Sequence, residues 1–242
     1  MTCLERYLAG EHEQVWAELR ALGNAIRREP VLSDARAVAA EMMRRVRRNL
    51  QRIVARLEAA GYTFGLYPDG TDGYYSDGPL VPLSGATRAE AIGLAERLGP
   101  LPLSLEAFWN EVGCVDLVGM HPAAPELLDP LVVHAPEGKL AELDDWEADC
   151  LEEGREGGTG ERFEAELAPD DLIKDNISGG PAYSVALPEP AADFVLLNER
   201  HGIDFVPYLR LAILRWGGFP GLEGRDERWN LVEGLTEGLE PF

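Results

Sequence analysis

The segment from Ser33 to Gly61 most constrains how this chain can fold, because its apolar residues recur at the three- and four-residue spacing of a helix. Ser33 or Asp34 can cap the start of this helix, and Gly61 can end it. We therefore expect one amphipathic helix within residues 33–61. Its apolar face consists of Val38, Met42, Val46, Leu50, Ile53, Val54 and Leu57.

The opposite face of this predicted helix is rich in arginine. A basic face of this kind can meet nucleic acid, a membrane surface or an acidic protein surface. We favour a plainer interpretation, in which the arginines pair with acidic groups of the same chain. A second hypothesis treats residues 34–60 as the docking surface of a regulatory scaffold. The arginines concerned are Arg44, Arg45, Arg47, Arg48, Arg52 and Arg56.

Charge is distributed unevenly along the sequence, which has 43 acidic residues, 22 basic residues and a net charge of −21. Residues 1–60 contain 11 arginines, no lysine and 8 acidic residues and are net positive, whereas the remaining 182 residues contain 11 basic and 35 acidic residues. An acidic body repels nucleic-acid phosphates and attracts basic proteins. It also favours solubility, so charge alone does not select a function.

The cysteines and the hydropathy of the sequence indicate in which cellular compartment the protein resides. Cys3, Cys114 and Cys150 are an odd number without metal-type or redox-type spacing, which favours a reducing compartment over a disulfide framework. The first residues carry charges throughout and lack the apolar core of a signal peptide. No apolar run approaches the ~18 residues of a membrane span. We expect a cytoplasmic protein that does not associate with membranes.

The order of elements along the chain favours an α+β fold. Helical patterns fill residues 1–61, and turn-rich hairpin patterns fill residues 62–85. Thr87 and Glu90 have the spacing of a capping box, so we expect Thr87 to cap a helix that ends at Gly99. Strand patterns then follow one another before a last helix capped by Asp204, and this succession differs from an alternating βαβ arrangement. We divide the chain into a helical segment (1–61), an α+β domain (62–222) and an acidic tail (223–242). The strand candidates are residues 115–120, 131–134, 163–167, 183–187 and 194–197.

Residues 101–119, LPLSLEAFWNEVGCVDLVG, predict a short helix that turns sharply into a strand. Ser104 can cap this helix by accepting a backbone hydrogen bond. Gly113 occupies the position of a left-handed C-terminal cap, and Val115 to Val118 read as a strand.

This stretch, with later pieces in the same order, resembles the SUKH superfamily of cell-wall-regulator-related proteins. The later pieces are Asp129 to Val133, Ala168 to Asp171 with Lys174, Ser178 to Pro181 with Tyr183, Phe205 to Arg210, and Gly217 to Gly221. The resemblance covers roughly residues 62–222. It implies a mixed or antiparallel sheet with packed helices and no active site. It further implies an immunity protein that neutralises a toxin domain, such as a nuclease.

A nuclease needs a basic face to hold phosphates, so an acidic immunity protein would both steer its approach and cover that face. The acidic residues between Asp144 and Glu166 are our first candidates for such charge partners, and Asp170 and Asp171 are the second. We expect no cofactor, no metal and no direct nucleic-acid contact. The predicted partner-binding residues are Asp144, Asp145, Glu147, Asp149, Glu152, Glu153, Glu156, Glu161, Glu164, Asp170 and Asp171.

An enzyme is the alternative from another functional class. A hydrolase could use Cys114 as a nucleophile or the polar cluster from Asp170 to Asp175. Cys114 precedes an apolar strand, where burial would raise its pKa and lower its reactivity. The four histidines have no metal-ligand spacing, and Ser178 to Pro181 lacks the lysine of a phosphate-binding loop.

Overall fold

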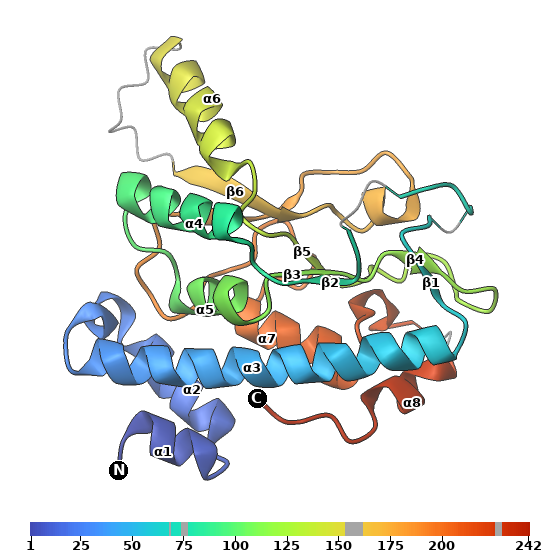
Figure 1. Ribbon diagram of the computed structural model, residues 1–242, viewed down its shortest axis with the longest axis horizontal. Helices are drawn as coiled ribbons and strands as arrows, with labels where there is room; N and C mark the ends of the chain where they lie inside the picture. The colour runs from blue at the N-terminus through green and yellow to red at the C-terminus, as the bar shows by residue number, and fades with distance from the viewer. Residues whose placement is uncertain (68, 74–76, 153–161, 226–228) are drawn as a thin grey trace.

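A computed structural model describes residues 1–67, 69–73, 77–152, 162–225 and 229–242. The fold class is α+β, as the order of the sequence patterns predicted, with small antiparallel sheets among more extensive helices. The long helix α3 (Val31–Ala59) runs across the molecule, with α1, α2 and α8 on one side and α4, α5, α6 and the sheets on the other (Figure 1).

Helix α3 has the predicted apolar face, but it begins two residues before the expected cap. Pro30 occupies the N-cap position, and the Asp34 carboxylate instead accepts hydrogen bonds from the Cys3 and Leu4 N–H groups at the start of α1. The prediction that Ser33 or Asp34 caps α3 is therefore wrong. The other end follows the prediction: Gly61 has a φ of 87°, and its N–H and that of Tyr62 bond back to the last turn.

The N-terminal segment is a broken pair of short helices that precede α3. Thr2 caps α1 in a reciprocal arrangement with Glu5, and Trp16 of α2 is fully buried. The elements are α1 (Cys3–Leu8), α2 (His12–Ala21) and the 3₁₀ turn η1 (Gly23–Arg27).

The middle of the chain forms two small antiparallel sheets and two helices. Strand β1 pairs with β4, whereas β3 lies between β2 and β5. Helix α5 packs against α3 and carries the chain into β3. The elements are β1 (Thr63–Phe64), β2 (Leu80–Val81), α4 (Gly85–Leu98), α5 (Leu103–Glu111), β3 (Cys114–Asp116), β4 (Gly119–Met120) and β5 (Val132–Val133).

The later part of the chain adds a two-stranded antiparallel sheet of β6 and β7 and a group of short helices. Helix α6 packs against α4 and β6, and Figure 1 shows it projecting from the top of the molecule. The elements are α6 (Lys139–Glu152), β6 (Phe163–Ala168), η2 (Ile173–Asp175), β7 (Tyr183–Leu187), α7 (Phe205–Arg210), the π-helical turn η3 (Leu211–Arg215), η4 (Pro220–Leu222) and α8 (Leu231–Thr236).

Two predicted helix caps and one predicted strand need correction. Ser84, not Thr87, caps α4, because its side chain accepts a hydrogen bond from the Thr87 N–H. Pro102, not Ser104, stands at the N-cap of α5. Residues 194–197 make only isolated bridges, from Val195 to Asp204 and from Leu197 to Ser184.

Ser104 is buried because it serves a connection between distant segments. Its hydroxyl donates to the Asp193 carboxylate at 2.9 Å, and the Trp16 indole N–H donates to the same carboxylate at 3.1 Å. The Val206 N–H approaches both Asp193 oxygens. Burial raises the pKa of Asp193, and these donors oppose that rise. One carboxylate thus joins α2, α5 and α7.

The buried apolar side chains form one cluster that includes Tyr7 near one end of the chain and Phe242 at the other. Helix α3 contributes to this cluster along its length. The three-part division at residues 61 and 222 stays a prediction, although all three parts contribute to the cluster. No helix among the described residues has both the length and the apolar character needed to cross a membrane.

We predict that Leu50→Ala destabilises the protein by about 2–5 kcal/mol, because Leu50 is fully buried on α3 and its loss leaves a cavity. Urea unfolding followed by far-UV circular dichroism measures this change. The control is Gln51→Ala on the exposed side of the same turn, expected to change stability by less than about 0.5 kcal/mol. Equal effects of the two substitutions would contradict the placement of α3.

Candidate functional site

Helix α6 carries six carboxylates and one lysine, and it contains several of the predicted partner-binding residues. Its packed side places Leu143 in the core and sets the Trp146 ring 5.8 Å from the Phe163 ring of β6. Sequence analysis did not predict this helix, although Leu140, Leu143 and Trp146 at three-residue spacing were the available signal. Five of the predicted partner-binding residues belong to it: Asp144, Asp145, Glu147, Asp149 and Glu152.

Two of these carboxylates hold α6 against α4. Arg97 of α4 donates to Asp144 Oδ1 and to Glu147 Oε2, each at 2.7 Å. The hydrogen bonds that Arg97 donates to these carboxylates, first to Asp144 and then to Glu147, raise the pKa of Arg97. Because all three groups are substantially exposed, this contact orients α6 more than it stabilises the fold.

Three other carboxylates form a separate row on α6. Asp145, Asp149 and Glu152 are four and three residues apart, so they share one helix face, turned away from the packed side. All three are exposed and make no ion pair with any described residue. Their mutual repulsion costs helix stability, about 0.2–0.5 kcal/mol per adjacent pair. We name Asp145, Asp149 and Glu152 the acidic row.

The remaining predicted residues do not join this row. Glu164 is exposed on β6, but strand alternation places it on the face opposite Phe163 and therefore opposite α6. Asp171 is half-buried in the turn before η2. Glu153, Glu156 and Glu161 lie outside the described residues.

Asp170 has an internal role, which corrects its prediction as a surface charge partner. It is 5% exposed, and its carboxylate accepts hydrogen bonds from the Ile173 N–H at 2.7 Å and from the Gly180 N–H. A Cβ on Gly179 would collide with the same carboxylate. The run from Ser178 to Pro181 is thus a turn closed around Asp170.

Lys174, which belongs to the cluster considered for hydrolysis, is also buried and forms an internal ion pair. Its ammonium donates to Asp129 Oδ1 at 2.5 Å, and neither side chain is more than 1% exposed. The Tyr183 hydroxyl donates to Asp129 Oδ2 at 3.2 Å, and the Tyr183 ring lies 4.5 Å from the ammonium. Burial, with Asp129 as a further cause, raises the pKa of Tyr183. Sequence spacing could not reveal this pairing, because Asp129 and Lys174 are 45 residues apart.

Cys114 is buried in β3, where it pairs with Val81. It lines a cavity of about 710 Å³ together with His134. Burial, followed by Lys139 and Lys174, lowers the pKa of His134 to about 4, so its imidazole is neutral at pH 7. A neutral imidazole carries no charge to stabilise the thiolate that nucleophilic catalysis needs. Within the described residues, no three His, Cys, Asp or Glu side chains gather to hold a metal ion.

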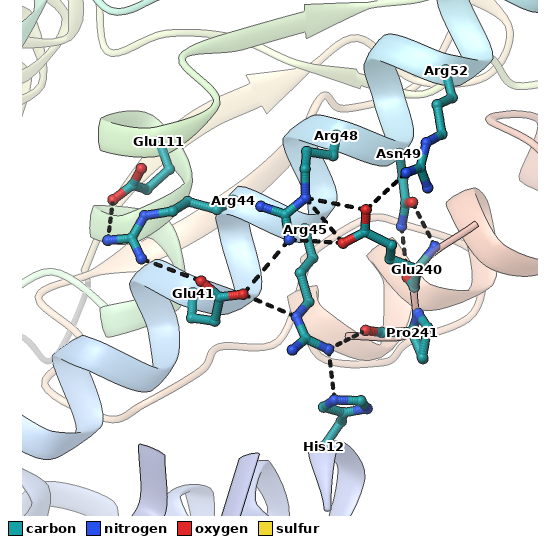
Figure 2. Close-up of polar contacts among 10 residues, drawn as sticks. All are labelled: His12, Glu41, Arg44, Arg45, Arg48, Asn49, Arg52, Glu111, Glu240 and Pro241. Carbon is teal, nitrogen blue, oxygen red and sulfur yellow. Dashed lines mark hydrogen bonds and ion pairs between the residues drawn. The ribbon is translucent and has the colours of Figure 1, made fainter. Parts of the chain in front are cut away.

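The arginine face of α3 is occupied by other parts of the chain, as Figure 2 shows. Arg48 and Arg52 both bind the Glu240 carboxylate, with shortest distances of 2.7 and 2.9 Å. Asn49 Nδ2 donates to the Glu240 carbonyl and Asn49 Oδ1 accepts from the Glu240 N–H, each bond 2.8 Å long.

Other arginines of this face also find partners within the chain. Arg44 lies 3.3 Å from Glu111, and Arg45 donates to Glu41 and to the Pro241 carbonyl. Arg56 donates to the Leu235 carbonyl, and Arg47 is exposed. The interpretation that these arginines pair with the chain's own acidic groups is confirmed for Arg44, Arg45, Arg48 and Arg52.

Comparisons with protein-family models, with curated proteins and with solved structures each found no match. The candidate site therefore depends on its own geometry: one helix that carries a row of exposed carboxylates.

We predict that Asp129→Asn costs about 3–5 kcal/mol of stability, because it leaves the Lys174 ammonium buried without its counter-charge. Asparagine retains the tolerance for the left-handed backbone that residue 129 adopts. Chemical denaturation measures the loss. The double variant D129N/K174M removes both charges and should recover a large part of it; no recovery would show that the two groups are not coupled.

We predict that Glu240→Gln lowers stability at pH 7 by up to about 1 kcal/mol. The hydrogen bond from Arg48 is the main cause that lowers the pKa of Glu240, so the stabilisation exists above the unfolded-state pKa and is lost as pH falls through the folded-state pKa. Wild type and variant should therefore converge in stability once the pH falls below the lowered folded-state pKa of Glu240. Thermal melts across pH test this, with exposed Glu237→Gln as the control.

Proposed function

We propose that this protein is a non-enzymatic binding protein that captures a basic protein partner through helix α6. The observation that carries the proposal is the acidic row, a set of carboxylates that repel one another and that no cation of the described residues neutralises. Such a row destabilises the isolated fold, and a basic partner would relieve the repulsion. The resemblance to the SUKH superfamily supports the more specific proposal of an immunity protein against a nuclease-like toxin.

The position of α6 suits this role. It projects from the body in Figure 1, so a partner can approach it without displacing other elements. Leu151 is 76% exposed and lies four residues after Glu147, so it flanks the Asp144 and Glu147 side of α6. An exposed apolar side chain on the same helix can supply contact area, whereas the charges supply steering.

The dipole of α6 adds to the cost of the row. Asp149 and Glu152 lie in the last turn, which contains no basic residue, and negative charge at a helix C-terminus is unfavourable by about 0.3–1 kcal/mol. Side chains that lower stability and serve no internal contact are expected where a partner binds. The same argument does not apply to Asp144 and Glu147, because Arg97 pairs with both.

The geometry gives less support to the alternatives from sequence. The hydrolase hypothesis is weakened because Asp170 holds a turn and Lys174 forms an internal ion pair. The scaffold hypothesis is weakened because Arg48 and Arg52 already form ion pairs with Glu240. The cysteines of this chain are free thiols, which is compatible with the reducing cytoplasm that we propose as its location.

The test uses the full-length protein and the product of the adjacent gene, because immunity genes sit beside their toxins. We predict that the triple variant D145N/D149N/E152Q slows association by about tenfold or more at low salt. The difference from wild type should shrink at about 0.5 M salt, where exposed charges are screened. Surface plasmon resonance across a salt series measures both rates.

A matched control removes the same number of charges from the far side of the molecule: E13Q/E58Q/E237Q on α2, α3 and the end of α8. This control should bind as wild type does, apart from a small change due to net charge. The α6 variant should also unfold at slightly higher denaturant concentration, since repulsion is removed. Equal loss of binding in both triple variants would contradict a localised site on α6.

A further inference from the structure

A cavity of about 540 Å³ lies where the loop after β4 faces the segment around η2, with Tyr62 in its wall. Met120, Leu127 and Pro130 give it apolar sides, and Asp69, Glu126 and Asp175 add carboxylates. Its size is within the range of small-ligand sites, which combine apolar walls with a few polar groups. The cavity is separate from the acidic row, since no residue of α6 lines it.

The charges of this cavity favour a cation. Lys174 lines it, but its ammonium is already paired with Asp129. Asp69 is held by Thr71 and by the Asn176 side-chain amide, and these hydrogen bonds lower its pKa. His121 Nε2 donates to the Ala60 carbonyl, and His121 Nδ1 accepts from the Ala123 N–H.

Among the carboxylates that line the cavity, Asp175 has an oxygen atom whose negative charge no hydrogen-bond donor of the described residues balances. Its Oδ2 atom is buried and has no hydrogen-bond partner among the described residues. Burial is the main cause that raises its pKa to about 6, and Asp129 and Asp171 act in the same direction. The Leu127 N–H and Arg225 oppose them, and Arg225 itself donates to the Glu126 carbonyl at the rim.

The wall that faces Asp175 is held in a fixed and strained shape. Leu127 and Asp129 have φ values of 53° and 47°, a conformation that a bulky residue such as leucine rarely adopts. The Gly221 N–H donates to the Leu128 carbonyl at 2.9 Å, and a Cβ on Gly221 would collide with this backbone. Strained backbone maintained by close packing is frequent at binding sites, where it preorganises the receptor.

We propose that this cavity receives a lysine or arginine side chain of the basic partner, with Asp175 as counter-ion. The apolar walls would cover the methylene groups of that side chain, as they do for other long cationic side chains. The identity of the occupant rests on the proposed function, which requires a basic partner. The cavity would then anchor the partner at short range, whereas the acidic row would steer it from a distance.

The direct test uses three small probes and needs no partner: Nα-acetyl-arginine amide, Nα-acetyl-lysine amide and the neutral Nα-acetyl-norleucine amide. Titrations by ¹H–¹⁵N NMR should show at least one cationic probe perturbing residues 119–130 and 172–177, with affinity about tenfold or more above that of the neutral probe. Equal binding of charged and neutral probes, or no perturbation of these residues, would overturn the proposal.

Two variants make the test specific. Asp175→Asn should reduce the affinity of the cationic probe to that of the neutral probe, and Ala124→Phe should block all three by filling the cavity. Asp175→Asn should fold at least as stably as wild type at pH 7.5, because a raised carboxyl pKa stabilises the fold only at low pH and that stability is lost as pH rises through about 6. Unchanged cation binding by Asp175→Asn would reject its role.

The adjacent-gene product separates this proposal from the proposed function. Asp175→Asn should speed dissociation of the complex about tenfold and leave the salt dependence of association unchanged. If the α6 variant weakens binding and Asp175→Asn does not, the cavity proposal fails and the proposed function stands. If the probes bind but the adjacent-gene product does not, the proposed function fails and the cation site stands.

Discussion

Burial of one face of α3 is the constraint on which the rest of this structure depends. That helix supplies buried side chains along its length, and α1, α5 and α8 all pack against it. An amphipathic helix gains most of its stability from such packing, not from intrinsic propensity. Elements that bear no direct contact with α3, such as α6, are therefore positioned through the layers that α3 holds in place.

Much of the framework could be predicted from local patterns. The apolar spacing of α3, Gly61 after its end and the alternation of β6 are local signals, and the structure contains each of these elements. Caps were predicted less well because Ser104 and Asp34 serve partners that are distant in sequence. Helix α6 was missed because its many carboxylates obscure a short apolar stripe.

The candidate site shows the same division between local and distant information. Acidic residues of α6 could be selected from the sequence because charge density is a local property. Their separation into an arginine-paired set and an unpaired row could not, because Arg97 is 47 residues from Asp144. Asp170 was misassigned for a related reason: its N–H donors lie in a turn that closes only in the folded chain.

The last residues of the described chain behave as part of the interior. Phe242 is 2% exposed, its carbonyl accepts a hydrogen bond from Arg210, and Asn49 is fully buried beside Glu240. Chain ends commonly tolerate trimming or fusion because little depends on them. Here a deletion of these few residues would open the hydrophobic cluster and uncover arginines of α3.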